Sequence, residues 1–317
     1  MSNKHFIGID VGGTKIHGGV VDEYGEIIHR HYTATPKEGG IYTMDALIDT
    51  IGGLLNFSED IVSIGIGSPG KVNPKTGSLE GCTPNMPGWH EQPLRQTIEQ
   101  SFSLPVYVDN DANAAAVGEY HCGAGRSYEN VVLLTLGTGV GSGIIIENQV
   151  LHGTKGKGGE LGHLIIEPKG KKCNCGQTGC LEAYASGTAI TKTAKTLIND
   201  PAYADSYLQK HKDELDGTHI FEGAFRKDTL CIKILEEMYF YFSIGIINIM
   251  NIFAPEVILI GGGISKQGNF LLNGIRMALS KVTTNRDILD PKFVQLATLK
   301  EDAGLIGAAF LGKSDFE

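Results

Sequence analysis

This sequence lacks an excess of positive charge and a long apolar run, and it shows no N-terminal targeting pattern. Its 27 lysines and arginines are outnumbered by 36 aspartates and glutamates, which gives a formal net charge of −9. A surface that binds nucleic acid must be basic, so nucleic acid is not expected as a main partner. The longest apolar stretch, residues 239–253, is interrupted by serine, glycine and asparagine. It is short of a membrane span and is predicted to be a buried helix.

The chain also opens without the charged, apolar and small-residue pattern of a secretory signal. A cytoplasmic location is therefore expected, with no membrane partner. A cytoplasmic chain of 317 residues does not need disulfides for its stability. Only six cysteines are present, and three of them fall within eight residues. Clustered cysteines in such a protein favour a metal site over a disulfide framework.

Glycine, by contrast, is abundant. The 43 glycines exceed the usual share of about 7%. They concentrate in five short segments, which indicates turns rather than a low-complexity tract: 12–19, 65–70, 137–143, 153–162 and 261–263. Between these turns, apolar runs typical of buried strands alternate with helical periodicity. This alternation predicts an α/β protein, and the length suits two domains.

The apolar patterns set the expected positions of the elements. Strands are predicted at 5–10, 15–22, 26–32, 61–67, 105–109, 131–136, 141–147, 149–152, 257–260 and 293–299. Helices are predicted at 43–57, 94–102, 112–120, 188–199, 219–226, 230–252 and 304–311.

Two distant segments resemble each other. Residues 7–29 and 133–152 both read as strand, glycine-threonine turn, strand, turn and strand. A repeat at this distance indicates two similar α/β halves, each beginning with a hairpin of a size that suits phosphate. A chance likeness between glycine-rich hairpins is the alternative.

The first hairpin contains Asp10, Gly12, Gly13, Thr14 and Lys15. The glycines let backbone N–H groups approach a phosphate closely, and Thr14 and Lys15 add a hydroxyl and a charge. Asp10, at the end of a buried strand, is suited to hold Mg²⁺ through water. The alternative is an ordinary turn with Asp10 as a cap. The segment lacks the spacing of a Walker loop.

Two further glycine turns fit a phosphate ligand. The second hairpin carries Gly137, Thr138 and Gly139, and with the first it could hold the β- and γ-phosphates of a nucleotide from both sides. The triplet Gly261, Gly262 and Gly263 follows a buried strand, where α/β sheets bind ligands. A plain strand-to-helix turn explains the triplet equally well.

Asp111 stands where a predicted strand meets a predicted helix. A sugar hydroxyl is not ionised at neutral pH, so a positioned carboxylate must accept its proton as the bond to phosphorus forms. Asp111 is a candidate for this role. The competing interpretation is that Asp109 or Asp111 caps the helix, as aspartate often does.

A possible metal site is the most specific pattern in the sequence. His163 is followed by Cys173, Cys175 and Cys180, with Gly176 and Gly179 placed to fold the chain back on itself. Three thiolates and one imidazole form a closed tetrahedral set, which predicts structural rather than hydrolytic Zn²⁺. The alternative is a reduced cluster without metal. Zinc here would join the segments that carry Glu160 and Glu182 and stiffen a sugar pocket.

Glu160 and Glu182 flank the cysteine loop and can accept hydrogen bonds from sugar hydroxyls. The amide groups of Asn85 and Asn110 can do the same. Each glutamate could instead be a solvated surface charge. The single tryptophan, Trp89, could pack on a sugar face, although packing in the core is the more common role.

Taken together, these motifs resemble the ROK family of repressors and sugar kinases, in the superfamily of hexokinase, actin and heat-shock ATPases. The resemblance covers nearly the whole chain. Its motifs are Asp10–Lys15, Asn85–Trp89, Asn110–Asn113, Gly137–Gly139, Glu160–His163, Cys173–Glu182 and Gly261–Gly263. The cysteine motif is highly specific to the family.

The resemblance implies a two-lobed, actin-like ATPase fold of ribonuclease H type with an interdomain cleft. The expected lobes are residues 1–118 plus 300–317, and residues 119–299 with the zinc loop. It implies Asp111 as catalytic base, ATP with Mg²⁺ as cofactor and a homodimer or homotetramer. Sugar contacts are expected from Gly70, Asn85, Asn110, Asp111, Glu160, His163 and Glu182. ATP contacts are expected from Asp10, Gly12, Gly13, Thr14, Lys15, Gly137, Thr138, Gly139, Gly261, Gly262 and Gly263.

Repressors of the family carry a DNA-binding segment before the first hairpin, and the nine residues ahead of Asp10 leave no room for one. The chain looks most similar to bacterial glucokinases, which implies phosphorylation of a hexose at the 6-hydroxyl. Kinases for fructose, N-acetylglucosamine and N-acetylmannosamine share nearly every motif residue. A sugar-sensing regulator without turnover is the alternative from another class. The sequence leaves open the sugar, the effectors and the choice between ATP and polyphosphate.

Overall fold

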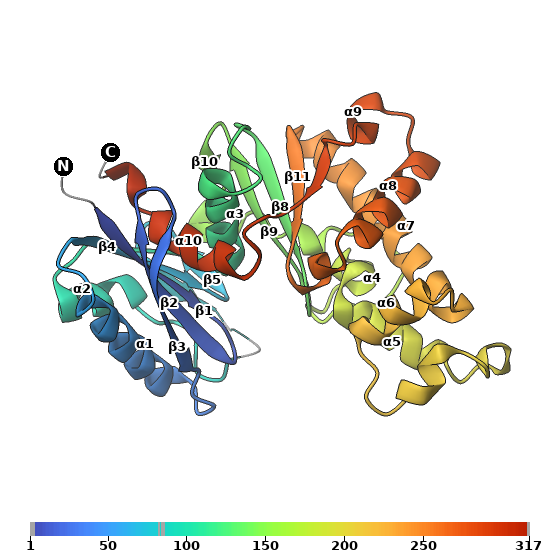
Figure 1. Ribbon diagram of the computed structural model, residues 1–317, viewed down its shortest axis with the longest axis horizontal. Coiled ribbons are helices and arrows are strands. Elements are labelled where there is room, and N and C mark those ends of the chain that lie inside the picture. The colour runs from blue at the N-terminus through green and yellow to red at the C-terminus, as the bar shows by residue number, and fades with distance from the viewer. Residues whose placement is uncertain (1–3, 82, 84–85, 316–317) are drawn as a thin grey trace. The chain divides into compact units, whose positions relative to one another are not determined.

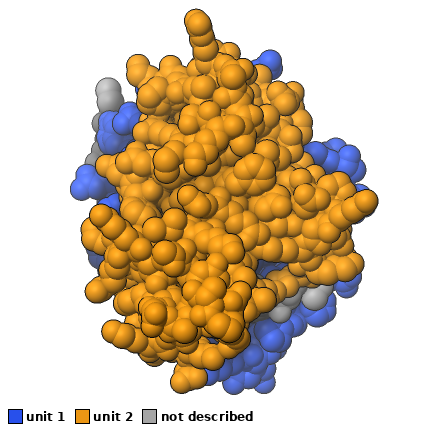
Figure 2. Space-filling view, turned by 90° about the vertical axis from the view of Figure 1, so that its right-hand side faces the viewer, with its two compact units in different colours: residues 1–131, 143–159, 298–317 blue, residues 132–142, 160–297 orange. Residues whose placement is uncertain are grey.

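The computed structural model describes residues 4–81, 83 and 86–315. Asn85, a predicted sugar contact, lies outside the described residues. The chain forms two compact units (Figure 2). Unit 1 comprises residues 1–131, 143–159 and 298–317, and unit 2 comprises residues 132–142 and 160–297. Residues 119–131 and 143–159 thus group with unit 1, whereas the lobes expected from the family resemblance remain a prediction.

Unit 1 is built on a five-stranded sheet with the order β3-β2-β1-β4-β7. Figure 1 labels the first four strands of the chain in this sheet. β1 and β2 form an antiparallel hairpin that continues into β3, whereas β1, β4 and β7 run parallel. The bounds are β1 His5–Val11, β2 Lys15–Asp22, β3 Ile27–Ala34, β4 Ile61–Ser68 and β7 Val106–Asn110. A short hairpin, β5 Lys71–Asn73 with β6 Ser78–Glu80, follows β4.

Helices cover both faces of this sheet. α1 (Gly40–Leu55) and α2 (Leu94–Phe102) bury their apolar sides against one face, in a core that includes Ile7 and Ile9. α10 (Ala303–Phe310) packs on the other face beside α3 (Asp111–Cys122). It lies so close that a Cβ on Gly8 or Gly65 would come within 2.1 Å or 1.7 Å of its carbonyl oxygens. Only glycine fits at these two positions.

A second sheet has the order β10-β9-β8-β11-β12. Its strands are β8 Val131–Leu136, β9 Val140–Ile146, β10 Gln149–Val150, β11 Val257–Gly261 and β12 Val294–Leu296. The helices of unit 2 are α4 Glu182–Ala185, α5 Gly187–Leu197, α6 Gly217–Phe225, α7 Thr229–Phe253, α8 Asn269–Val282 and α9 Arg286–Leu289. The long apolar run forms α7 and is largely buried, as predicted. Within the described residues, no helix is long and apolar enough to cross a membrane.

Every predicted strand and helix is present, with bounds that shift by a few residues. The hairpin of β5 and β6 and the helices α4, α8 and α9 were not predicted. Trp89 is fully buried, and its indole N–H donates a hydrogen bond of 3.0 Å to Ser68 Oγ. It therefore packs in the core of unit 1 and offers no face to a sugar.

Candidate active site

Polar side chains gather at the carboxyl ends of three parallel strands in unit 1. Asp10 on β1 pairs with Gly67 on β4, and Gly67 pairs in turn with Asp109 on β7. The next pair along the sheet is Ser68 with Asn110. This edge of a parallel sheet is where α/β proteins bind ligands. The fold thus brings together Asp10 and the Asn110–Asp111 segment, which are far apart in the sequence.

Asn110 fixes the start of α3. Its side-chain oxygen accepts hydrogen bonds from the backbone N–H groups of Ala112 (2.9 Å) and Asn113 (3.4 Å), which makes it the N-cap. Its side-chain amide donates to the carbonyl oxygen of Gly70 at 3.0 Å. Gly70 has a φ of 99°, a conformation that favours glycine. Because Asn110 performs the capping, Asp111 is not needed as the cap.

Asp111 is the first residue of α3 and is partly exposed. One carboxylate oxygen accepts a hydrogen bond of 2.9 Å from the N–H of Ala112. The positive end of the helix dipole favours the ionised, proton-accepting form of a carboxylate at this position. This placement is compatible with the role of base predicted for Asp111, and that role stays a prediction.

Asp10 has an altered acidity. The pKa of its carboxyl group is raised from 3.8 to about 6, chiefly by burial and also by the negative charge of Asp111, while Lys15 opposes the shift. Two carboxylates that repel each other are stabilised by a divalent cation placed near them. The pair is thus chemically suited to hold a divalent cation such as Mg²⁺.

Asp10→Asn is expected to increase stability in the absence of metal and to impair turnover. The folded-state pKa of Asp10 lies above the unfolded value, so its favourable contribution is present below pH 3.8 and is lost as the pH rises through 6. At pH 8 the ionised carboxylate costs on the order of 3 kcal/mol, which asparagine removes.

Chemical unfolding of the metal-free variant and wild type at pH 5 and pH 8 measures this effect. Asp45→Asn makes the same change on the exposed side of α1 and serves as control. A variant that is no more stable than wild type at pH 8 would show that burial and Asp111 do not make the ionised Asp10 side chain unfavourable.

The structure also reveals a pair that the sequence analysis did not anticipate. His152 Nε2 lies 2.6 Å from Asp109 Oδ2. The other oxygen of the buried Asp109 accepts hydrogen bonds from the backbone N–H of Asn110 (2.7 Å) and the amide of Asn113 (2.9 Å). The hydrogen bond to Asp109 raises the pKa of His152 despite partial burial. This network holds the β7–α3 junction that carries Asp111.

His152→Gln is expected to destabilise unit 1 by about 2 kcal/mol, because it weakens a hydrogen bond to a buried carboxylate. The folded-state pKa of His152 lies above 6.5, so its charged contribution is present below pH 6.5 and is lost as the pH rises through the folded pKa. The loss should therefore be larger at pH 6 than at pH 9. Chemical unfolding at both pH values measures it, with the exposed His31→Gln as control. Equal losses at both pH values would contradict a charged pair.

The first predicted phosphate hairpin joins β1 to β2. The N–H of Gly12 donates to the carbonyl of Lys15 at 2.9 Å, and Gly13, Thr14 and Lys15 are exposed. Thr35, which was not singled out from sequence, holds this turn. Its hydroxyl donates to the carbonyl of Gly12 at 2.6 Å, and its N–H donates to the carbonyl of Thr14 at 3.1 Å.

In unit 2 the two other predicted phosphate segments lie together. A Cβ on Gly262, whose φ is 79°, would come within 2.5 Å of the backbone of Leu136, directly before the second hairpin. The carbonyl of Gly137 accepts a hydrogen bond of 2.8 Å from the N–H of Gly187, at the start of α5. Gly137–Gly139 and Gly261–Gly263 thus form one surface of unit 2, with Thr138, Gly262 and Gly263 exposed.

Glu182 stands between the second hairpin and the cysteine loop. Its Oε2 accepts a hydrogen bond of 3.0 Å from the N–H of Val140, and its Oε1 lies 3.6 Å from Cys173 Sγ. A Cβ on Gly139 would come within 2.4 Å of this carboxylate, so a larger residue there would displace it. Glu160 is exposed and precedes the short turn that carries His163.

The four predicted metal ligands come together in unit 2. The ligand atoms of His163, Cys173, Cys175 and Cys180 all lie within 4.8 Å of one another. Cys173 Sγ is 3.8 Å from His163 Nδ1, and Cys175 Sγ is 3.7 Å from Cys180 Sγ. Two sulfurs bound to one tetrahedral zinc at about 2.3 Å are separated by about 3.8 Å, so the residues fit this ion.

The cysteine loop takes the path that its glycines were expected to allow. Gly176 and Gly179 have φ values of 94° and 85°. A Cβ on Gly179 would come within 1.9 Å of the carbonyl of Glu167. The separation of Cys175 Sγ and Cys180 Sγ is far longer than the approximately 2.05 Å of a disulfide bond. The geometry therefore suits a metal site and not a crosslink.

The protein has the fold of the actin-like ATPases. Its mixed sheet carries a glycine hairpin and has carboxylates at the edge where the parallel strands end. The sequence model described as "ROK family" matches residues 6–315. The chain belongs to the ROK family.

Similar proteins include kinases and repressors. The chain is 38% identical to a glucokinase of Halalkalibacterium halodurans, over 99% of this chain and 96% of the relative. Its sequence is 37% identical to that of a ROK family glucokinase from Streptomyces griseus, whose crystal structure was solved in complex with glucose and AMPPNP. The two structures superpose with a TM-score of 0.81. That match covers 98% of this chain and 99% of the other. A xylose repressor of Caldicellulosiruptor bescii is 32% identical, over 98% of this chain and 78% of the repressor.

Proposed function

We propose that this protein is an ATP-dependent hexose kinase that phosphorylates the 6-hydroxyl of glucose. The observation that carries the proposal is the junction of β7 and α3, where Asn110 caps the helix and Asp111 is its first residue. The near-full-length similarity to glucokinases supports the same activity.

Asp111 acts as the general base in this proposal. Its carboxylate accepts the proton of the sugar hydroxyl while the hydroxyl oxygen forms a bond to the γ-phosphorus and the bond to the leaving ADP oxygen breaks. The network of Asn110, Asp109 and His152 keeps the carboxylate in place. Asn110, Gly70, Glu160, His163 and Glu182 are proposed to position the sugar, together with Asn85.

Asp10 is proposed to bind Mg²⁺ through a water molecule. The Mg²⁺ ion would supply positive charge to the phosphates of ATP. Backbone N–H groups of the Gly12–Lys15 hairpin and of the Gly137–Gly139 hairpin would contact the phosphates. Gly261–Gly263 would complete the nucleotide contacts. The crystal structure with AMPPNP supports ATP as the donor for a related glucokinase.

An ADP-release assay with a panel of sugars tests the function. Glucose is expected to give the highest kcat/KM, with fructose, mannose, N-acetylglucosamine and N-acetylmannosamine well below it. A higher value for an amino sugar would assign the chain to that kinase subgroup. Sugar binding by calorimetry with no ADP release from any sugar would instead support a sugar-sensing regulator, which the similarity to a xylose repressor makes the second candidate.

Structural zinc, a homodimer or homotetramer and a cytoplasmic location complete the proposal. Zinc is supported by the geometry of the four ligands. Sedimentation analysis of the purified protein would measure the oligomeric state.

A further inference from the structure

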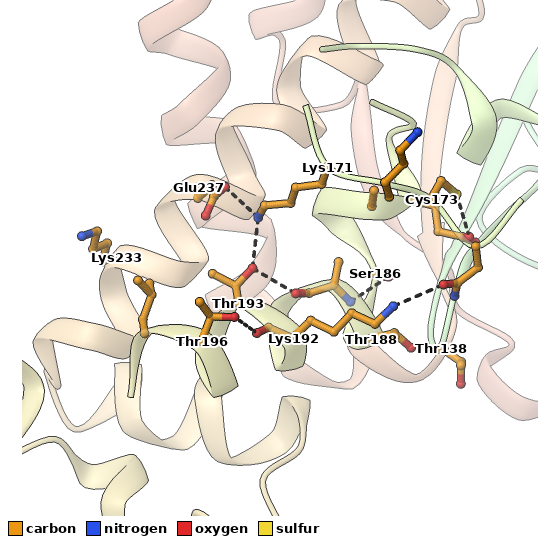
Figure 3. Close-up of a pocket in the computed structure, with 16 residues that line it drawn as sticks. Thr138, Lys171, Cys173, Ser186, Thr188, Lys192, Thr193, Thr196, Lys233 and Glu237 are labelled. Atoms are coloured by element: carbon orange, nitrogen blue, oxygen red, sulfur yellow. Dashed lines mark hydrogen bonds and ion pairs between the residues drawn. The ribbon is translucent and has the colours of Figure 1, made fainter. Parts of the chain in front are cut away.

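A cavity of about 500 Å³ lies within unit 2 (Figure 3). Residues of α5, α7 and the segment that leads into the cysteine loop line it. Of the proposed ATP contacts, Thr138 is the one found among the described lining residues. The volume falls within the range of small-molecule sites in proteins. The cavity therefore offers room for a ligand other than the nucleotide.

The charge of the lining is opposite to that of the chain. Four lysines and two glutamates line the cavity, in a protein with a net charge of −9: Lys171, Lys172, Lys192, Lys233, Glu182 and Glu237. Lys171 is neutralised by Glu237, with 2.8 Å between Nζ and Oε1. Glu182 is engaged by the N–H of Val140. This hydrogen bond leaves Glu182 negatively charged, so the lining keeps a net charge of +2, four lysines minus two glutamates.

The three lysines other than Lys171 have neutral partners or none among the described residues. Lys192 Nζ donates to Asn174 Oδ1 at 3.2 Å, and Lys233 Nζ donates to the hydroxyl of Tyr203 at 2.9 Å. Lys172 is exposed, and no ion pair is found for it in the described part of the chain. Lysine ammonium groups bind phosphate oxygens as point charges. Lys192, bonded to Asn174, and Lys172, next to Cys173, both lie at the cysteine-loop end of the cavity, where an anionic group could bind them.

The rest of the lining is suited to an organic molecule. Ala183, Ala189 and Leu197 supply apolar surface. Thr193 and Thr196 donate their hydroxyl hydrogens to carbonyls within α5, whereas the hydroxyls of Thr138 and Thr188 have no such bond among the described residues. Apolar walls with a few polar groups are typical of metabolite sites. The lining thus matches a molecule that has both a carbon skeleton and phosphate.

The cavity is connected to the second hairpin. Thr138 at the tip of this hairpin and Glu182, which accepts from Val140 N–H at 3.0 Å, both line it. Gly187, which donates to the Gly137 carbonyl, begins the helix that forms one wall. A ligand in the cavity would therefore contact groups that hold the proposed phosphate hairpin.

We propose that this cavity binds a small phosphorylated metabolite, which acts as an effector of the hairpin at Gly137–Gly139. The lysines at its rim neutralise the phosphate charge, and the apolar walls contact the carbon skeleton. The effect on the hairpin rests on the proposed kinase function, whereas binding in the cavity does not.

Calorimetry of the full-length protein tests the proposal, with glucose and a non-hydrolysable ATP analogue present to occupy the active site. The probes are inorganic phosphate, tripolyphosphate and fructose 1,6-bisphosphate. Fructose 1,6-bisphosphate is expected to bind wild type, and Lys192→Glu is expected to weaken this binding at least tenfold. Lys195→Glu is the matched control, because Lys195 is an exposed residue of the same helix outside the cavity. Its affinity should stay within twofold of wild type.

Three results would overturn the proposal: no binding of any probe, equal weakening by both variants, or a changed oligomeric state in Lys192→Glu alone. The last result would make this face a subunit contact. A kinetic measurement separates binding in the cavity from an effect of the bound ligand on the hairpin. Fructose 1,6-bisphosphate should change the KM for ATP in wild type and not in Lys192→Glu. A protein that binds the probe but has no kinase activity would retain the cavity site and lose the proposed function.

Discussion

Replacement of Asp111 by asparagine is expected to lower kcat by about 10³-fold, while the affinities for glucose and ATP change little. General-base catalysis contributes about 10²- to 10⁴-fold, and asparagine keeps the size of the side chain without its basicity. The fold should be unaffected, because Asn110 caps α3 and continues to do so in the variant. Steady-state kinetics and calorimetry with glucose measure the two effects.

Asp45→Asn again provides the control, since it removes an exposed carboxylate from α1 in the same unit. It should retain full activity. Turnover by Asp111→Asn within tenfold of wild type would remove Asp111 from the role of base. A large rise in KM at unchanged kcat would assign it to sugar binding instead.

Cys180→Ser is expected to abolish zinc binding and to destabilise unit 2 severely. Cys180 is fully buried and offers one of the four ligand atoms. Structural zinc in small zinc-binding peptides contributes on the order of 10 kcal/mol, so even a fraction of this would rival the stability of a domain. Elemental analysis and thermal unfolding with and without a strong chelator measure both effects.

Cys122→Ser is the matched control. Cys122 is half-buried in unit 1 and is not one of the four clustered ligands, and its thiol donates to the carbonyl of Tyr24 at 3.7 Å. This variant should keep its zinc and most of its stability. Less than half an equivalent of zinc in folded, active wild type would contradict the structural role of the metal.

The sequence predicted the elements well where turn residues limit them on the chain. β2, β8 and α2 have the expected bounds: β2 follows the Gly12–Thr14 turn, β8 ends before Gly137, and α2 lies between Pro93 and Pro105. α8 was not predicted, because it follows Gly268 without a side-chain cap and its first turn lacks an acidic residue. The hairpin of β5 and β6 was missed because three-residue strands carry too little pattern.

The candidate site shows a similar limit. The cysteine cluster could be predicted because its ligands are close in sequence and chemically specific. The pair of Asp109 and His152 could not, because these residues are separated by 43 positions and no local motif contains both. The altered acidity of Asp10 likewise arises from burial and from Asp111, both of which depend on the fold. The spacing of residues along the sequence predicts ligand sets that are close in the chain. Electrostatic interactions between residues far apart in the chain depend on the folded structure.

The close packing of α10 on Gly8 and Gly65 has a consequence for biosynthesis. Leu305, Ile306 and Phe310 share a buried cluster with Phe6 and Val21, so the first and last elements of unit 1 complete one core. On the ribosome, the N-terminal strands emerge long before the helix that covers them. Their glycine-lined face must wait while the whole of unit 2 is translated. All segments of unit 2 are therefore synthesised before the helix that completes the core of unit 1.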